Sequence, residues 1–266
     1  MQYVNIGGVK VSRFIIGSNP FSGFSHQGVE RDEAMMRYYT ARRIVETLHQ
    51  AESLGVNTVI ARTDHHVIRT LMEFYNEGGR LQWFAQTCPE VGPQAMCIDR
   101  AIQIGARAVH IHGGWMDWLW LNGRIGEVKP LIERIKGEGL LAAVAGHRSE
   151  VIEWARDNLE LDYFMTSYYN PIPRDKNPLH VSGLEEIYDE EHRRVMTDLV
   201  QTLPAPAIHY KVLAAGRNDP AEAIRFCASR MRENDAVCVG VYTADKSDML
   251  KENIDRLDKS LAAAAV

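Results

Sequence analysis

The residues best suited to chemistry are histidines that alternate with other residues in two short apolar segments. His110 and His112 are separated by a single residue, and so are His209 and Lys211. Because residues two apart on a β-strand point to the same face, we expect each pair to face together. Two such strands indicate a polar pocket that is lined by several imidazoles and one amine.

Clustered imidazoles predict a divalent metal site. Neutral imidazole is a common zinc ligand and also binds iron, and three protein ligands with one open position are typical of a catalytic metal. Such a metal would polarise a carbonyl group or lower the pKa of a bound water to about 7. A pocket without metal, built from the same side chains, is the alternative. The expected ion is zinc, manganese or iron, and the predicted ligands are His110, His112, His147 and His209.

The predicted catalytic residues are Asp64, His112 and Lys211. Asp64 follows an apolar segment and is expected to act as a metal ligand or as a base. Lys211 is expected to act as a base or to stabilise negative charge, and a desolvated lysine would also permit a Schiff base. An ion pair between Lys211 and Asp64 or Glu90 is the structural alternative for this lysine.

A second group of residues is predicted to contact the substrate. The loop after the first buried segment is rich in chain breakers, and the charged stretch that follows it to residue 37 is a candidate lid. Three closely spaced tryptophans predict either a stacking wall or a contact surface, which would suit a homo-oligomer. The irregular loop at residues 171–183 is expected to close over the site. The predicted substrate-binding residues are Asn19, His26, Trp115 and Tyr168.

The elements that must position these residues repeat one pattern, in which a helical segment and a glycine precede an apolar strand. Strands alternating with helices favour a closed parallel barrel, in which active sites form at the carboxyl ends of the strands. The sequence therefore predicts one (β/α)8 barrel domain over residues 1–266, with an N-terminal hairpin at residues 1–11 that plugs its bottom. The expected strands are 14–17, 57–61, 81–86, 108–112, 140–144, 162–167, 207–211 and 236–241.

Composition narrows the possible partners. The chain has 266 residues, of which 45% are hydrophobic, enough for a full barrel core. Its net charge of −5 is distributed without a basic block, so neither nucleic acid nor a membrane surface is an expected partner. The four cysteines show no metal-binding spacing, and the start of the chain lacks a signal pattern. We expect a cytoplasmic protein with a small-molecule substrate.

Several short motifs, in order, resemble the aldo-keto reductases. Residues 1–17 look like the family's opening hairpin and first strand, and residues 168–171, Tyr-Tyr-Asn-Pro, resemble the end of its sixth strand. Residues 213–216 look like its pyrophosphate loop, and residues 250–253 like the helix near the adenosine. The resemblance implies the barrel fold. It also implies NADP as a cofactor, contacted by Tyr169, Gly216, Glu252 and Asn253.

The chain departs from that family at its catalytic tetrad. Of the Asp, Tyr, Lys and His that the family uses, only the histidine has an obvious counterpart, His112, or His110 if the register shifts. The preferred prediction is therefore a non-redox, metal-assisted lyase, isomerase or hydrolase that acts on a small polyhydroxylated or keto substrate. The alternatives are a divergent NADP-dependent oxidoreductase and a non-catalytic barrel that binds a ligand or a partner protein.

Overall fold

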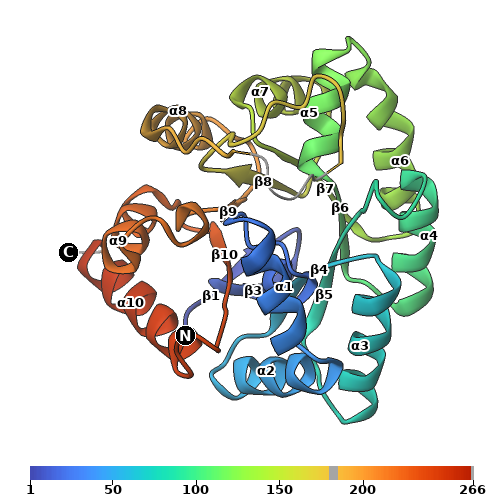
Figure 1. Cartoon of the computed structure of the whole chain (residues 1–266). Coiled ribbons are helices and arrows are strands. Elements are labelled where there is room, and N and C mark those ends of the chain that lie inside the picture. Colours follow the sequence, from blue (N-terminus) through green and yellow to red (C-terminus); the bar gives the residue numbers. More distant parts are fainter. Residues whose placement is uncertain (180–184, 265–266) are drawn as a thin grey trace.

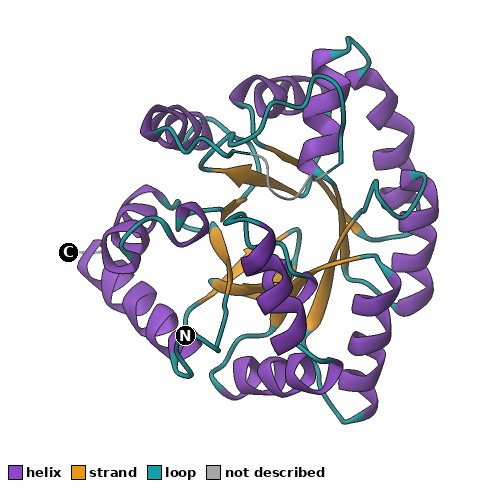
Figure 2. Ribbon diagram, viewed as in Figure 1, coloured by secondary structure: helices purple, strands orange, loops and turns teal. Residues whose placement is uncertain are grey.

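In the computed structural model, which describes residues 1–179 and 185–264, parallel strands close into a barrel and helices form a ring around it (Figure 1; Figure 2). The neighbour order around the barrel is β10-β3-β4-β5-β6-β7-β8-β9. This arrangement confirms the predicted (β/α)8 barrel. The strands are β3 (Phe14–Gly17), β4 (Thr58–Arg62), β5 (Gln82–Gln86), β6 (Ala108–Ile111), β7 (Leu141–Gly146), β8 (Tyr163–Ser167), β9 (Ala207–Tyr210) and β10 (Ala236–Gly240).

Helices follow most of the strands and cover the outside of the barrel. They are α1 (Val29–Tyr38), α2 (Ala41–Ser53), α3 (His65–Asn76), α4 (Gln94–Ile104), α5 (Gly113–Leu121), α6 (Lys129–Gly137), α7 (Ser149–Asn158), α8 (Glu190–Val200), α9 (Pro220–Arg230) and α10 (Met249–Ala264). Short 3-10 helices occur at η1 (Asn19–Ser22), η2 (Ile125–Val128) and η3 (Ala214–Gly216). The loop after β3 contains η1, and the stretch expected to be a lid forms a short turn and α1. No helix in the described part of the chain is long and apolar enough to cross a bilayer.

The N-terminal hairpin closes the amino end of the barrel, as the sequence predicts. Strands β1 (Tyr3–Ile6) and β2 (Val9–Ser12) pair antiparallel across Gly7 and Gly8, which adopt φ values of +55° and +81°. A tight turn of this kind favours glycine, because a side chain is strained at positive φ. The apolar hairpin side chains join the inward-facing strand residues in one buried cluster, so they plug the bottom of the barrel.

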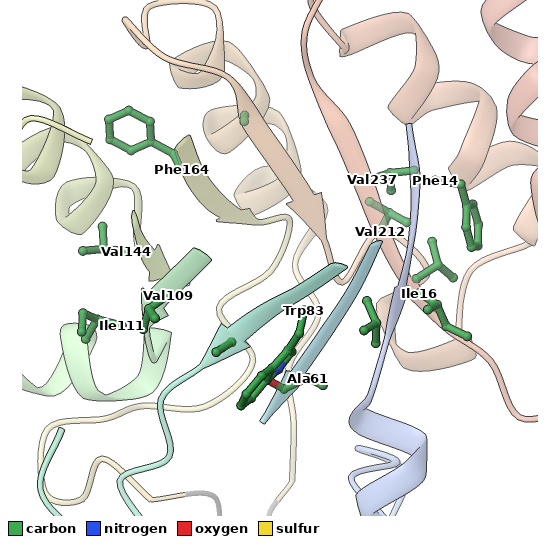
Figure 3. Close-up of a cluster of buried hydrophobic side chains, with 14 of the residues drawn as sticks. Phe14, Ile16, Ala61, Trp83, Val109, Ile111, Val144, Phe164, Val212 and Val237 are labelled. Atoms are coloured by element: carbon green, nitrogen blue, oxygen red, sulfur yellow. The ribbon is translucent and has the colours of Figure 1, made fainter. Parts of the chain in front are cut away.

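Strand residues that point away from the barrel axis pack against the helices. Figure 3 shows outward side chains such as Phe14, Trp83, Val109 and Phe164 in this buried layer. Their neighbours along each strand point inward, where Phe84, for example, joins the cluster beneath the barrel mouth. This alternation matters for function, because it decides which polar residues enter the barrel.

Candidate active site

A cavity of about 600 Å³ opens at the carboxyl ends of the strands. Side chains from β6, from the loops after β3, β7 and β9, and from the first turns of α10 line it. A pocket of this size accommodates a small metabolite. Of the residues singled out from the sequence, those on its wall are Asn19, His26, His110, His112, His147, Lys211, Gly216, Glu252 and Asn253.

A chain of three polar side chains runs from the cavity into the loop before α8. Lys211 Nζ lies 2.9 Å from His26 Nε2, and His26 Nδ1 lies 2.6 Å from Glu186 Oε1. A protonated Lys211 donates to Nε2, so the neutral imidazole carries its proton on Nδ1 and donates it to the carboxylate. Lys211 and His26 both adopt left-handed backbone conformations, with φ of +57° and +58°. Two strained residues that meet side chain to side chain are typical of functional sites.

The environment prepares Lys211 to exchange a proton near neutral pH. Burial lowers the pKa of Lys211, the charge of Glu186 opposes this shift, and the charges of Arg174 and Arg217 add to it, so that the pKa is about 8. Burial raises the pKa of Glu186, but hydrogen bonding and charge from His26, with help from Tyr188, outweigh this and hold that pKa at about 2. Glu186 is therefore a fixed negative charge that orients His26.

A buried carboxylate orients a second imidazole on another part of the wall. Asp117, on α5, accepts from Nδ1 of His147 at 2.7 Å and from the His147 backbone amide at 3.2 Å. Burial lowers the pKa of His147, and Asp117 only partly opposes this shift. The neutral imidazole therefore keeps its proton on Nδ1, and Nε2 is left as the acceptor. Such a carboxylate–histidine pair supplies a base of fixed orientation.

His112 and His110 also line the cavity as neutral imidazoles. Burial, together with the charges of Arg62 and Arg174, lowers the pKa of His112 well below its usual value. Burial lowers the pKa of His110 to about 3, and its Nδ1 lies 3.2 Å from the Tyr163 hydroxyl. His112 Nδ1 and His110 Nε2 are buried and have no hydrogen-bond partner among the described residues.

Two buried guanidinium groups lie on the cavity wall, and they differ in how they are neutralised. Arg62 forms two ion pairs: its Nε lies 3.1 Å from Asp64 Oδ2, and its Nη2 lies 3.0 Å from Glu90 Oε2. Arg174, only 6% exposed, donates to the carbonyl oxygens of Leu179 and Pro178 and makes no ion pair within the described residues. Its charge is therefore available to an anionic ligand, because backbone carbonyls orient a guanidinium without neutralising it.

The predicted metal centre is not assembled. Strand β9 turns Ile208 and Tyr210 inward, so His209 points outward. There, His209 Nε2 lies 3.5 Å from Asp235 Oδ2, and the imidazole ring lies edge-on to the Tyr168 ring. The predicted convergence of His209 with the other histidines is therefore wrong. Lys211 still reaches the cavity, because its positive φ breaks the strand alternation. Within residues 1–179 and 185–264, no group of three or more His, Cys, Asp or Glu side chains could hold a metal ion.

Asp64 has a local structural role and does not line the cavity. Its carboxylate accepts from the Val67 amide at 2.9 Å, which caps the amino end of α3. Its other oxygen pairs with Arg62. Glu90 likewise pairs with Arg62, so neither carboxylate forms the expected ion pair with Lys211.

Three predicted ligand-binding aromatics pack away from the cavity. Tyr168 is fully buried against His209 and Phe226, because its side chain points toward the helices. The Tyr169 hydroxyl is bonded to Glu190 and Asn218. Trp115 packs partly buried against the core that surrounds α5. Of the loop at residues 171–183, expected to close over the site, residues 180–183 lie outside the described residues, whereas Arg174 does contact the cavity.

Four side chains of the candidate site were not identified from the sequence: Asp117, Arg174, Glu186 and Tyr210. Tyr210 follows from the alternation of β9 once the correct register is known. Asp117 lies in the first turns of a helix that directly follows a strand end, a position from which a carboxylate can reach the neighbouring strand. Arg174 and Glu186 come from irregular loops, where no periodic signal exists.

Comparison with known proteins shows a likeness of fold. No protein-family model matches the chain, and no curated protein matches it. Two solved structures from Pseudomonas aeruginosa, each provisionally assigned as an aldo-keto reductase, are 18% and 16% identical with TM-scores of 0.64 and 0.65. The alignments cover 97% of this chain in both cases, and 96% and 95% of those chains. The fold is an aldo-keto-reductase-like barrel.

A third solved structure shares the barrel. It is a truncated 3-deoxy-D-arabino-heptulosonate 7-phosphate synthase from Thermotoga maritima, 12% identical with a TM-score of 0.59, and the match covers 100% of this chain and 94% of that chain. Barrels of one architecture perform many unrelated reactions, so chemistry must be argued from the site.

Proposed function

We propose that this protein is a non-redox acid–base enzyme, an isomerase or lyase, that acts on a small keto or polyhydroxylated substrate in the barrel mouth. One observation carries the proposal: the chain Lys211–His26–Glu186 and the pair His147–Asp117 end in the same cavity. Two oriented proton acceptors at one cavity are what removal of a proton beside a carbonyl, and its return at a neighbouring atom, require. The enzyme folds that the barrel resembles add support.

In the proposed reaction, the Lys211 amine takes a proton from the carbon next to the substrate carbonyl. With a pKa of about 8, about a tenth of Lys211 is neutral at pH 7. The C–H electron pair moves into the carbon skeleton, and the carbonyl oxygen becomes an enolate. The proton is shared between the Lys211 ammonium and His26, which Glu186 stabilises as a cation, and it returns from Lys211 to the neighbouring carbon.

Another part of the wall would stabilise the enolate and move the hydroxyl proton. Burial raises the pKa of Tyr210 well above its usual value, so its phenol stays protonated and can donate a hydrogen bond to the enolate oxygen. His147 Nε2, held by Asp117, is placed to accept or return a hydroxyl proton. A divalent metal would polarise the carbonyl, but the described residues do not form its ligand set, so no step is assigned to it.

Hydrogen–deuterium exchange tests this proposal without knowledge of the product. Purified protein is incubated in D₂O with a panel of ketoses, aldoses and 2-keto acids, and loss of the C–H signal next to the carbonyl is followed by proton NMR. We expect exchange with at least one compound, and a decrease of at least 100-fold in Lys211→Met. Lys10→Met, a substitution on the exposed face of the hairpin, is the matched control. Equal exchange in Lys211→Met and wild type would refute the role of Lys211.

A divergent NADP-dependent oxidoreductase is the second candidate, because the cavity extends along Gly216, Glu252 and Asn253. These three of the four predicted cofactor residues line it, whereas Tyr169 does not. Titration with NADPH, followed by tryptophan fluorescence, tests this candidate. Saturable binding that weakens in Asn253→Ala, together with an absence of deuterium exchange, would favour the oxidoreductase over the acid–base enzyme.

A further inference from the structure

We infer that the amino end of α5 is a carboxylate-binding subsite of this cavity, formed by the amides of Gly113 and Gly114 with Arg174 and His112. The inference rests on the proposed function and names its substrate class, 2-keto or 2-hydroxy carboxylates. Gly113, His112 and Arg174 all line the cavity.

The two glycines allow the backbone to lie directly against the polar side chains of the cavity. A Cβ atom on Gly114 would lie 3.0 Å from His112 Cε1 and 3.3 Å from Arg174 Cζ. A Cβ atom on Gly113 would lie 3.0 Å from the Tyr210 hydroxyl and 3.1 Å from His147 Cε1. Any larger residue would displace these side chains, so the glycines keep the first turn of α5 in contact with the site.

The amides of this turn are available to a ligand. The first N–H groups of a helix have no partner within the helix, and the helix dipole makes this end attractive to anions. Among the described residues, the His112 amide donates to Thr87, whereas no acceptor is found for the amides of Gly113 and Gly114. The first turn of this nine-residue helix carries no acidic side chain that could occupy them.

Two buried side chains supply an independent indication of a ligand. Arg174 is only 6% exposed and makes no ion pair within the described residues, and its bonds to backbone carbonyls all use one nitrogen, Nη1. His112 is 9% exposed, and its Nδ1 has no partner among those residues. A desolvated guanidinium costs free energy unless an anion pairs with it, so a ligand carboxylate would satisfy the groups that the chain leaves open.

The chemistry of the site favours a carboxylate over a phosphate. Arg174 is one planar guanidinium, which matches the two oxygens of a carboxylate. A phosphate dianion would bring a second negative charge into a site where Asp117 already interacts electrostatically with Arg174. A carboxylate held here would place its neighbouring carbon toward His147 and Tyr210, because both adjoin Gly113.

Isothermal titration calorimetry in HEPES buffer of low ionic strength tests the subsite. The probes are pyruvate and gluconate, with inorganic phosphate for comparison, and the variants are Arg174→Gln and Gly114→Ala. We expect at least one carboxylate to bind the wild type more tightly than phosphate does, with the Kd raised at least tenfold in both variants. Gly137→Ala, at the end of α6 where an added Cβ meets open space, should bind like the wild type.

Three results would overturn the subsite: no carboxylate binding to the wild type, tighter binding of phosphate, or an unchanged Kd in Arg174→Gln. Near-UV circular dichroism checks the fold of each variant, and Arg174→Gln decides the question if Gly114→Ala fails to fold. Lys211→Met separates the subsite from the proposed reaction. Carboxylate binding that persists in Lys211→Met, with deuterium exchange absent even in the wild type, would retain the subsite and refute the acid–base enzyme.

Discussion

Burial of the His110 imidazole inside the barrel makes the stability of the protein depend on pH. Its side chain is fully buried, and its polar contact is with the Tyr163 hydroxyl. Burial lowers its pKa from 6.5 to about 3. Below pH 6.5 the unfolded chain therefore binds a proton that the folded protein does not, so stability decreases as the pH falls from 6.5 toward 3.

We predict that His110→Gln makes the protein more resistant to acid. Glutamine retains a hydrogen-bonding group for Tyr163 but cannot be protonated, so the loss of stability between pH 7 and pH 4.5 should shrink by roughly 2 to 3 kcal/mol. Urea unfolding at the two pH values measures the change. His66→Gln, on the exposed surface of α3, serves as the control. An unchanged pH dependence in His110→Gln would contradict the assignment.

The alternation of side chains along a strand does not predict the directions of His209 and Lys211. His110 and His112 both reach the cavity, although His112 already lies beyond the end of β6. The same rule places His209 and Lys211 together, yet His209 faces the helices and Lys211 faces the cavity. The left-handed φ at Lys211 reverses the direction of its side chain. A lysine in that conformation is uncommon, and its identity gives no local signal for it.

At the scale of elements, Asp64 connects β4 to α3. It caps the helix through the Val67 amide and pairs with Arg62, which ends the strand. The sequence predicts a catalytic role for Asp64. An aspartate that follows a barrel strand suits both catalysis and helix capping, so the sequence alone does not distinguish the two roles. The hydrogen bond to the helix, and the absence of Asp64 from the cavity wall, favour the structural role.

We predict that Asp64→Ala destabilises the protein by about 1 kcal/mol, the usual effect of removing an amino-terminal helix cap. Asp64→Ser should recover most of that loss, because a serine hydroxyl also accepts from the amide two or three residues on. Chemical denaturation measures both variants. Loss of deuterium exchange in Asp64→Ser, with stability unchanged, would instead support the catalytic role expected from the sequence.

The periodic elements were predictable, and the connections were not. β3 matches its predicted range of 14–17, and the other barrel strands begin or end within two residues of theirs, because buried parallel strands are short apolar runs bounded by glycine and polar residues. Glu186 lies in the irregular stretch before α8, and its partner His26 is distant in sequence. No local pattern could have paired them.

At the scale of the whole molecule, the two ends of the barrel differ in physical character. The amino end is filled by apolar hairpin side chains, including the fully buried Ile6 and Val11. The carboxyl end holds the cavity and two strained residues that contact each other. It also holds buried groups, such as Lys211 and His112, whose pKa values are lowered so that the neutral form is favoured. In barrels of this kind, the amino end generally contributes stability and the carboxyl end carries the active site.

This division predicts that removing the buried amine stabilises the protein while abolishing its proposed reaction. The pKa of Lys211 falls from 10.5 to about 8 on folding, so at pH 7 the folded state holds a buried charge at a penalty of roughly 3 kcal/mol. Lys211→Met removes that penalty and also the hydrogen bond to His26, which contributes about 1 kcal/mol. The expected net gain at pH 7 is about 2 kcal/mol.

The pH dependence distinguishes this cause from better packing. Between pH 8 and 10.5 the wild type loses the Lys211 proton in the folded state first, so its stability rises with pH and the advantage of Lys211→Met shrinks. Thermal unfolding of both proteins from pH 6 to 10.5, beside Lys10→Met, measures the difference. A variant that is less stable than the wild type at pH 7 would show that Lys211 supports the fold, and a constant difference across the pH range would show that packing, not charge, is responsible.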